Sequence, residues 1–366
     1  MKILLISGSF PPMKCGVGDY TKFLANALGE RGDVSVAVLT DEKARLNPPS
    51  AYFQVFPVAK GWKFSDMAPI LETIRHFRPD IVHIQFPTQG YGRKKLPWLL
   101  SIFLAAMKIP TIQTWHEYYP LGGFMNIPNA IVGGGLIVVR PNYLEKMPSW
   151  FRWLNRKKHF RYIPNASPLP SVSVNEEERS AIRSNYAGQS KALVAYFGFA
   201  YPEKNIEALF ELCDPHRHQL VLVCDLNASD KYHSVILQKI RVEPWVKSVT
   251  VTGFLPADEV ARILAVADVV VLPFRDGGGS WNTSLLGAIS QGTFVLTTST
   301  EERGYHPSQN IYFAQPGNID EMKNALEKYI GNRPINNSQD YLKGWNFVSN
   351  EHVDFYKSII AKSTQH

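Results

Sequence analysis

The fold is decided by ADVVVLPFRDGGGSWNTSLLGAISQGTFVLTT, which covers residues Ala267–Thr298. The stretch opens with the apolar run Val269–Leu272, which has the length and composition of a strand buried on both faces. A glycine cluster, Gly277–Gly279, follows. Apolar residues then recur at helical spacing up to Gly292, which fits the position just after a helix end. A second apolar strand, Phe294–Leu296, closes the stretch. Strand, loop, helix and strand together predict a βαβ unit.

The loop of this unit lies at the carboxyl end of a strand, where ligands bind in open α/β sheets. Asn282, Thr283 and Ser284 stand at the expected helix start, where free backbone N–H groups and the helix dipole attract phosphate. The same residue types also cap helices without any ligand. From this stretch alone, anion binding and simple helix capping are both open.

Composition is typical of a large globular protein. The 366 residues suit two domains, and 45% apolar residues suit large cores. The three cysteines, Cys15, Cys213 and Cys224, show no metal-ligand spacing and no even count, which favours a reducing, cytoplasmic compartment. Lys2–Ser7 has the pattern of a first strand rather than of a signal peptide. No apolar run reaches the roughly eighteen residues of a membrane span.

Positive charge is concentrated in the first half of the chain. Residues 1–180 hold 22 Lys and Arg against 13 Asp and Glu, a balance of +9, whereas residues 181–366 hold 17 against 19, a balance of −2. A basic half favours an anionic partner. Because no nucleic-acid-binding motif is present, we expect a phosphate-bearing substrate or a membrane surface, and no nucleic acid. Two basic-aromatic segments, 93–100 and 149–158, suit anionic lipid or else form a solvated basic face beside core aromatic residues.

Strand and helix patterns alternate along the chain in two similar halves, as in two mostly parallel sheets. We expect a first Rossmann-like domain at 1–170, a linker at 171–190 and a second Rossmann-like domain at 191–346. Part of the linker, about 176–186, has a helical pattern. A final helix at 347–366 is expected to pack back on the first domain.

Two further features follow strands of the first half. The segment Cys15–Tyr20 holds Gly16 and Gly18, which let the backbone approach a ligand closely. A dinucleotide fingerprint would need Gly-x-Gly-x-x-Gly directly after the strand, so this spacing excludes a dehydrogenase. His116 follows the apolar run Pro110–Trp115. It either points into the crevice where chemistry would occur or is bonded to backbone within its loop.

The segment Tyr196–Asn205, with the sequence YFGFAYPEKN, resembles the strand, loop and helix that open the donor-binding domain of retaining glycosyltransferases of family 4. Val251–Pro256, Cys15–Tyr20, His116-Glu117 and Ile163–Asn165 also resemble motifs of that family and stand in the expected order. The resemblance covers nearly the whole chain. It implies an α/β protein of the GT-B fold, in which two Rossmann-like domains face each other across a cleft for the donor nucleotide.

The resemblance also implies roles for single residues. Lys204 matches the lysine that contacts the donor diphosphate, where it would offset charge developing on the leaving nucleotide. Gly16 and Gly18 match the loop that approaches the donor phosphate, and His116 matches the histidine near the transferred sugar. Further donor-binding residues are expected in the second domain, at Gly198, Asn282, Thr283 and Ser284.

The chain departs from the family pattern at two places. Family members usually carry Arg after the glycine that matches Gly198, and Phe199 stands there instead. They also usually carry two glutamates separated by seven residues, and the corresponding positions are Gly279 and Gly287. Asp276 is the expected substitute for the first acid, as a catalytic residue beside His116 and Lys204. No carboxylate replaces the second.

The expected reaction transfers a sugar from a nucleoside-diphosphate sugar, a UDP-sugar or GDP-sugar, to an acceptor hydroxyl with the anomeric configuration retained. We expect no cofactor and no metal site, because no Asp-x-Asp motif occurs and Lys204 can neutralise phosphate. The basic first half would hold a saccharide or lipid-linked saccharide acceptor. The setting would be polysaccharide or glycolipid assembly in the cytoplasm, with peripheral contact at the inner face of the membrane. The alternatives are a GT-B sugar-nucleotide epimerase or hydrolase and a degenerate, non-catalytic nucleotide-binding subunit.

Overall fold

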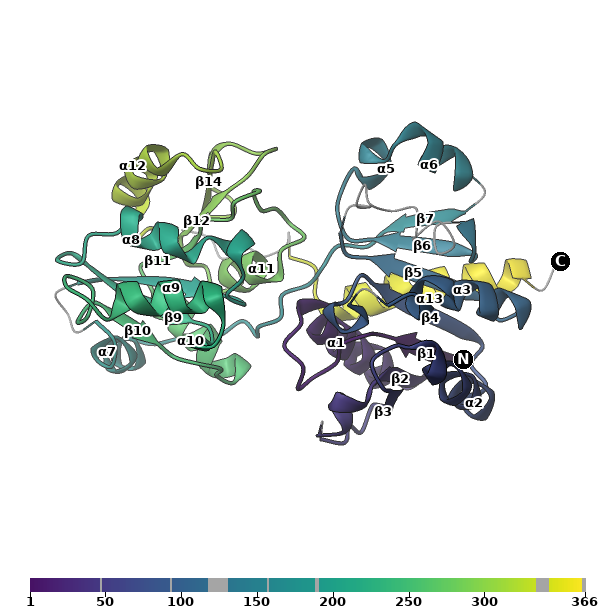
Figure 1. Ribbon diagram of the computed structural model, residues 1–366. Coiled ribbons are helices and arrows are strands. Elements are labelled where there is room, and N and C mark those ends of the chain that lie inside the picture. The colour runs from purple at the N-terminus through teal and green to yellow at the C-terminus, as the bar shows by residue number, and fades with distance from the viewer. Residues whose placement is uncertain are drawn as a thin grey trace. The chain divides into compact units, whose positions relative to one another are not determined.

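A computed structural model describes residues 1–46, 48–92, 94–117, 131–156, 158–187, 191–333 and 342–363. The chain divides into two compact units: unit 1 holds Met1–Ala166 and Lys343–His366, and unit 2 holds Ser167–Leu342 (Figure 1). Each unit is an α/β sheet covered by helices. The undescribed parts of the predicted features are residues 47, 93, 118–130 and 157 of the expected first domain, 188–190 of the expected linker, 334–341 of the expected second domain and 364–366 of the expected final helix.

Unit 1 is built on seven parallel strands. These are β1 Lys2–Ile6, β2 Ser35–Asp41, β3 Phe53–Ala59, β4 Ile81–Phe86, β5 Thr111–Trp115, β6 Gly135–Val138 and β7 His159–Tyr162. Their order in the sheet is β3-β2-β1-β4-β5-β6-β7. Every residue of β1 after Lys2 is buried, as expected for a central strand that is covered on both faces.

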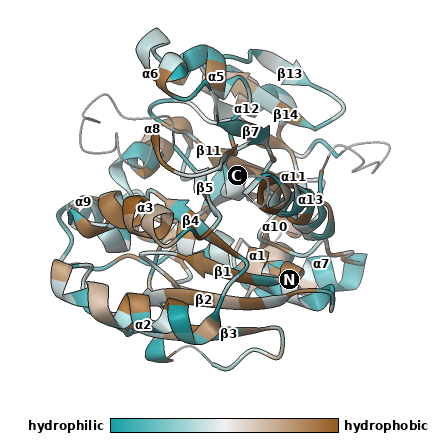
Figure 2. Cartoon of the chain, turned by 90° about the vertical axis from the view of Figure 1, so that its right-hand side faces the viewer, coloured by the Kyte–Doolittle hydropathy of each residue, from teal (hydrophilic) through white to brown (hydrophobic). Residues whose placement is uncertain are grey.

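Helices cover both faces of this sheet. They are α1 Gly16–Glu30, α2 Met67–Phe77, α3 Leu96–Ala106, α5 Tyr143–Lys146, α6 Ser149–Leu154 and α13 Trp345–Ser363. On one face α1 packs beside α13, and Leu24, Leu28 and Val353 join one buried apolar cluster. On the other face, Ile74 of α2 and Leu104 of α3 belong to a second cluster. Figure 2 shows α3 as a largely hydrophobic helix.

Unit 2 repeats this architecture. Its strands are β8 Ala192–Phe197, β9 His218–Val223, β10 Val249–Val251, β11 Val269–Leu272, β12 Val295–Thr298, β13 Gly304–His306 and β14 Ile311–Ala314. Their order is β10-β9-β8-β11-β12-β14-β13, and only β13 runs antiparallel. The helices are α7 Glu176–Ser184, α8 Leu209–Leu212, α9 Lys231–Ile240, α10 Ala257–Val266, α11 Thr283–Ile289 and α12 Ile319–Tyr329.

The two Rossmann-like sheets confirm the α/β class predicted from the alternation of strand and helix patterns. Two strands were not predicted: β3, which contains Pro57, and β13, which is only three residues long and nowhere fully buried. The segment 171–190 was expected to be a linker, but in the structure it belongs to unit 2. Its helix α7 packs against α10, and Arg183 pairs with Asp268. The final helix belongs to unit 1.

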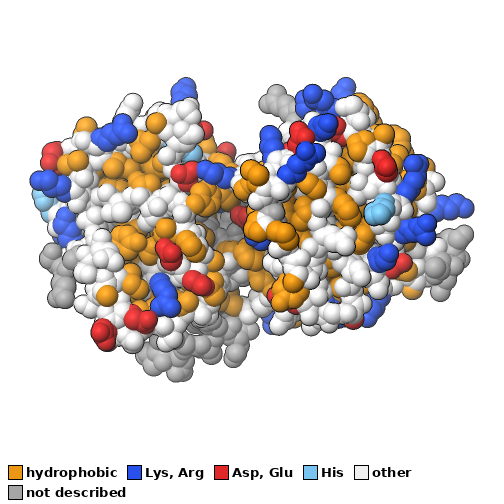
Figure 3. Space-filling view, turned by 90° about the horizontal axis from the view of Figure 1, so that it is seen from below, with side chains coloured by type: hydrophobic (Ala, Val, Ile, Leu, Met, Phe, Trp, Pro, Cys, Tyr) orange, Lys and Arg blue, Asp and Glu red, His pale blue; other side chains and the backbone are white. Residues whose placement is uncertain are grey.

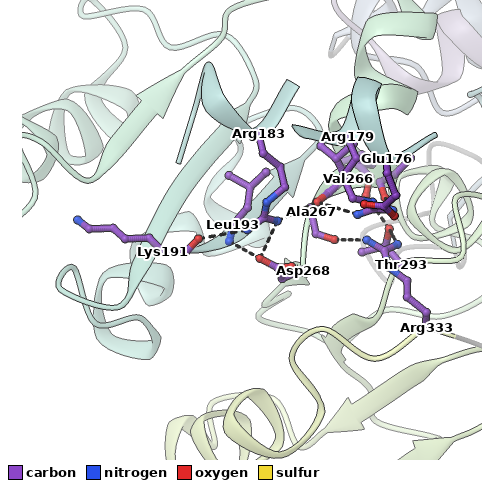
Figure 4. Close-up of polar contacts among 12 residues, drawn as sticks. Glu176, Arg179, Arg183, Lys191, Leu193, Val266, Ala267, Asp268, Thr293 and Arg333 are labelled. Atoms are coloured by element: carbon purple, nitrogen blue, oxygen red, sulfur yellow. Dashed lines mark hydrogen bonds and ion pairs between the residues drawn. The ribbon is translucent and has the colours of Figure 1, made fainter. Parts of the chain in front are cut away.

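A polar cluster stabilises the amino ends of β8 and β11 in unit 2, and we name its four members the arginine cluster: Arg179, Arg183, Asp268 and Arg333 (Figure 4). The Asp268 carboxylate accepts bonds from Arg183 (2.9 Å) and from the backbone N–H of Leu193 (2.7 Å). All three arginines also donate to carbonyls at the end of α10, from residue 265 to residue 267. Such carbonyls lack partners within the helix and favour cations.

Candidate functional site

The glycine loop after β11 is held by backbone contacts and by Asn282. The Gly278 N–H donates to the Thr298 carbonyl at 2.7 Å, and the Gly279 N–H donates to Asn282 Oδ1 at 2.9 Å. Asn282 therefore closes the glycine turn, and its side chain makes no cap bond to α11. Gly277 has a φ of 78°, a conformation that favours glycine. The loop is thus a fixed, tight turn at the carboxyl end of a buried strand.

The loop after β8 lies against the first turn of α11. A Cβ atom at Gly198, whose φ is 140°, would stand 3.5 Å from Ser284 Cβ. Thr283 and Ser284 are the first two residues of α11, and Ser284 is buried. Because α11 has only seven residues, its dipole is short. An anion at this turn would therefore be bound by its hydroxyl and backbone amide groups more than by the helix dipole.

Lys204 is brought to the same edge of the sheet. It ends a short 3₁₀ helix, Pro202–Lys204, and its Nζ lies 4.4 Å from the ring centroid of Phe274 at the start of the glycine loop. Arg275 fastens the two loops together: its N–H donates to the Glu203 carbonyl at 3.0 Å, and its guanidinium donates to the Pro202 carbonyl at 2.8 Å. The structure therefore places a lysine beside the glycine loop within one unit.

The positions of the two missing glutamates are filled by apolar side chains. A Cβ atom at Gly287 would lie 3.1 Å from Leu169 and 3.3 Å from Phe197. A Cβ atom at Gly279 would lie 2.3 Å from the ring of Trp281. A side chain at Gly287 would require Leu169 and Phe197 to shift by a few tenths of an ångström, and one at Gly279 would require the Trp281 ring to move. Asp276, the expected substitute, is exposed on the loop.

Phe199 stands in an aromatic group where the family pattern has a cation. Its ring stacks on Tyr201 with centroids 5.8 Å apart, and it lies 6.0 Å from Phe254. This group offers apolar faces at the carboxyl ends of β8 and β10. A diphosphate at this edge would therefore depend on Lys204 for its positive charge.

In unit 1 the two glycines of α1 have different surroundings. A Cβ atom at Gly18 would lie 3.0 Å from the Ser9 carbonyl oxygen, so this glycine lets the helix pack closely on the loop after β1. A Cβ atom at Gly16 would meet nothing within 4 Å. Only Gly16, exposed at the helix start, offers open space to a ligand.

His116 follows β5 and is only 9% exposed. Its Nε2–H donates to Gln85 Oε1 at 2.9 Å, and its ring meets the edge of Tyr20 with centroids 4.7 Å apart. The imidazole is therefore bonded to a side chain of β4 and not to backbone. With Nε2 as the donor in a neutral ring, Nδ1 remains as an acceptor.

Gln85 and Tyr20 connect His116 to α13. The amide of Gln85 lies 3.1 Å from His83 Nε2, and His83 Nδ1 bonds to the Tyr356 hydroxyl at 2.7 Å. The Tyr20 hydroxyl lies 3.3 Å from His352 Nε2, and His352 Nδ1 donates to the Val348 carbonyl at 2.7 Å. We call these six buried side chains the histidine network: Tyr20, His83, Gln85, His116, His352 and Tyr356.

All three imidazoles of the histidine network are neutral near pH 7. Burial lowers the pKa of His116 to about 3 and of His352 to about 4, and the proximity of His352 acts in the same direction on His116. Burial also holds the pKa of His83 well below its usual range. His116 is therefore a hydrogen-bond acceptor and a weak base rather than an acid.

The predicted site residues fall in two groups. Gly198, Lys204, Asp276, Asn282, Thr283 and Ser284 gather in unit 2, whereas Gly16, Gly18 and His116 belong to unit 1. The sequence analysis did not identify Gln85 or His83. The available signal was two polar residues, two positions apart, within the otherwise apolar strand Ile81–Phe86. Among the described residues no group of three or more His, Cys, Asp or Glu side chains could hold a metal ion.

Two Rossmann-like sheets and a lysine beside a glycine loop are typical of proteins with the GT-B fold. Comparisons with known proteins agree. Residues 15–178 match the family model Glycosyltransferase Family 4, and residues 191–332 match the model Glycosyl transferases group 1. No curated protein sequence matches the chain. Together with the structural neighbours below, the two models support a glycosyltransferase of the GT-B fold.

Three solved structures illustrate the shared fold. Sucrose-phosphate synthase from Thermosynechococcus elongatus has a TM-score of 0.78 at 15% identity, with 99% of this chain and 100% of that chain covered. Starch synthase IV from Arabidopsis thaliana, bound to ADP and acarbose, gives 0.68 at 14% identity with full coverage of both chains. Anabaena Alr3699/HepE, in complex with UDP and glucose, gives 0.66 at 16% identity over 100% and 97%.

Proposed function

We propose that this protein is a retaining glycosyltransferase that moves a sugar from a nucleoside-diphosphate sugar to an acceptor hydroxyl. The observation that carries the proposal is the position of Lys204, whose Nζ lies 4.4 Å from the Phe274 ring at the start of the glycine loop. A lysine held there offsets the charge that develops on the leaving diphosphate. Retention is inferred from the family motifs and from the match of residues 15–178.

In this proposal the bond between the anomeric carbon and the diphosphate oxygen breaks, and a bond to the acceptor oxygen forms. The proton of the acceptor hydroxyl passes to the leaving diphosphate. With a pKa of about 3, His116 is too weak a base to take that proton efficiently. Its Nδ1, an acceptor in the neutral ring, instead accepts a hydrogen bond from a hydroxyl of the transferred sugar. Asp276, exposed on the glycine loop, remains the candidate for a second contact with that sugar.

The donor is proposed to be a UDP-sugar or a GDP-sugar. Among the structural neighbours, HepE is described in complex with UDP and the starch synthase with ADP. A thermal-shift panel of UDP, GDP, ADP and dTDP would identify the base. A nucleotide at about 100 times its Kd adds about 2.7 kcal/mol of stability. We expect one nucleotide to stabilise the wild type much more than Lys204→Ala. A panel without any shift would contradict a nucleotide-dependent enzyme.

A second candidate is a non-catalytic nucleotide-binding subunit. It is favoured by the apolar side chains of Leu169 and Trp281, which fill the space around the two glycines that replace glutamates. Such a subunit would bind a nucleotide and turn nothing over. A hydrolase would instead release free nucleotide from the sugar nucleotide at a rate that does not respond to added acceptors.

We further propose peripheral contact with anionic lipid through α6, as part of cell-surface polysaccharide or glycolipid assembly at the cytoplasmic face of the membrane. Phe151 is buried in the core, whereas Trp150 and Trp153 are 46% and 62% exposed beside Arg152. The guanidinium of Arg156 lies 4.4 Å from the Trp153 ring centroid. Figure 3 views unit 1 from below, the side away from α6 in Figure 1, and there too basic side chains lie among hydrophobic ones. No described helix is long and apolar enough to cross a bilayer.

Flotation with phosphatidylglycerol vesicles tests this contact. Exposed aromatic and basic side chains bind an anionic interface together, so Trp153→Ser should reduce the floated fraction several-fold. Phe254→Ser, which removes an equally exposed aromatic ring from unit 2, is the matched control and should leave flotation unchanged. Equal flotation with neutral phosphatidylcholine vesicles would contradict the proposal.

A further inference from the structure

A pocket of about 350 Å³ opens in unit 1, and none of the catalytic or donor-binding residues assigned so far lines it. It lies at the carboxyl ends of β1, β2 and β4, the edge of an open α/β sheet where ligands bind. Its lining includes Ser9, Lys14, Asp41, Lys43, Gly90 and Lys94. Ligand pockets usually span about 300–1,000 Å³. This one is at the small end, which suits one monosaccharide with a phosphate group.

One wall of the pocket is fixed by direct backbone packing. A Cβ atom at Gly90 would lie 1.7 Å from the Gly8 carbonyl oxygen, so the loops after β1 and β4 can meet only because this residue is glycine. The Gly90 N–H also donates to Ser9 Oγ at 2.7 Å. These contacts hold the two loops together, and the pocket between them is preorganised for a ligand.

The charge of the lining favours an anion. Lys14, Lys43 and Lys94 contribute three positive charges against the single carboxylate of Asp41. No ion pair joins Lys43 or Lys94 to another described residue. Asp41 is only 3% exposed, and its Oδ1 accepts a bond from the Lys43 N–H at 3.1 Å. The pocket therefore combines a net positive charge with one buried carboxylate that suits a sugar hydroxyl.

We propose that this pocket binds the phosphate group of the acceptor, so that the acceptor is a phosphate-bearing saccharide rather than a neutral one. The inference rests on the proposed function, because it assigns the acceptor to unit 1 and the donor contacts of Lys204 to unit 2. The ammonium groups of Lys43 and Lys94 hold the phosphate, and Asp41 accepts a hydroxyl of the sugar. The phosphate belongs either to a soluble sugar phosphate or to a lipid-linked saccharide.

The test uses the full chain and two probes, glucose 6-phosphate and glucose, in calorimetric titrations at constant ionic strength. Wild type should bind glucose 6-phosphate much more tightly than glucose. Loss of one hydrogen bond to a charged group weakens binding about 10-fold or more, so Lys43→Gln with Lys94→Gln should weaken it about 100-fold. Lys108→Gln removes one charge from an exposed turn at the amino end of β5 and should change nothing. All variants should bind the nucleotide that stabilises the wild type in the thermal-shift panel, and they should unfold as wild type does.

The outcomes separate the two proposals. Binding to phosphatidylcholine vesicles only when they contain polyprenyl phosphate, lost in the double variant, would support a lipid-linked source. If the double variant loses the binding of glucose 6-phosphate alone, a soluble sugar phosphate would be supported as the source. Unchanged affinity of the double variant for both probes, or displacement of glucose 6-phosphate by UDP, would overturn the acceptor site. Failure of wild type to bind UDP or any other nucleotide would contradict the proposed function instead.

Discussion

The histidine network of unit 1 and the arginine cluster of unit 2 are both largely buried polar groups, yet they use opposite chemistry. The histidine network contains three imidazoles that burial keeps neutral. The arginine cluster contains three charged guanidinium groups around Asp268. Burial lowers the pKa of Arg333 to about 10, and this group is still protonated at neutral pH.

Their positions explain the difference. The arginine cluster lies at the amino ends of β8 and β11, where its donors satisfy backbone carbonyls at the end of α10. The histidine network reaches the carboxyl end of β5 through His116. Ligands of open α/β sheets bind at the carboxyl ends of strands. Charge at one edge therefore stabilises the fold, whereas at the other edge His116, a neutral imidazole, can offer Nδ1 as an acceptor to a substrate.

The strongest test of this contrast is a substitution at the carboxyl edge of unit 2. Lys204→Ala should lower turnover at least about 100-fold, the scale seen when one charge-stabilising donor is lost from an active site. The free energy of unfolding should change little. Lys231→Ala, on the exposed first turn of α9, is the matched control in steady-state kinetics. Turnover of Lys204→Ala near the wild-type value would remove Lys204 from the site.

Acid should destabilise unit 1 through the histidine network. A histidine whose folded pKa is lowered binds its proton more readily in the unfolded chain, so its contribution is present above about pH 6.5 and is lost as pH falls toward the folded pKa. In that window, each such histidine changes the free energy of unfolding by about 1.4 kcal/mol per pH unit. Asp19, whose pKa burial raises to about 6, acts in the opposite sense and offsets about one of the three histidines.

The net expectation is that the free energy of unfolding falls as the pH is lowered from about 6 to about 4. Urea titrations at a series of pH values measure it, with tryptophan fluorescence as the probe. The arginines of unit 2 stay protonated throughout this range and do not contribute to the pH dependence. In unit 1, His352→Phe should make the free energy of unfolding vary less with pH. A stability that does not change over this range would show that the imidazoles are not neutral in the folded protein.

At the amino edge of unit 2, loss of a single carboxylate should cost stability alone. Asp268→Ala leaves Arg183 and the Leu193 N–H without their shared acceptor. This substitution should lower the free energy of unfolding by about 2–3 kcal/mol. Glu327→Ala removes an exposed partner of Arg217 and should cost less than about 1 kcal/mol. Chemical denaturation compares the two. Binding of UDP should be unchanged in both, and a loss of nucleotide affinity in Asp268→Ala would contradict a purely structural role.

The contrast also shows what the sequence could reveal. Val269–Leu272 and the glycine loop predicted strand β11 and its turn because local apolar runs and glycines determine those elements. The pairing of Gln85 with His116 spans 31 positions, and that of His83 with Tyr356 spans 273. No local pattern specifies such contacts. The contact of Leu169 with Gly287 likewise comes from tertiary packing, so the sequence showed a missing acid but not the side chain that packs against its position.

The smallest expected effect comes from one hydroxyl of the histidine network. Tyr356→Phe keeps the ring packed on His83 but removes the 2.7 Å hydrogen bond to its Nδ1. One such bond contributes about 1 kcal/mol. Tyr312→Phe, which removes a longer 3.3 Å bond to Glu321 in unit 2, is the matched control and should cost less. If the histidine network also orients His116, then Tyr356→Phe should raise the KM for the donor sugar while the control does not. Equal KM values for the two variants would show that the histidine network contributes to stability and does not orient His116 for the donor sugar.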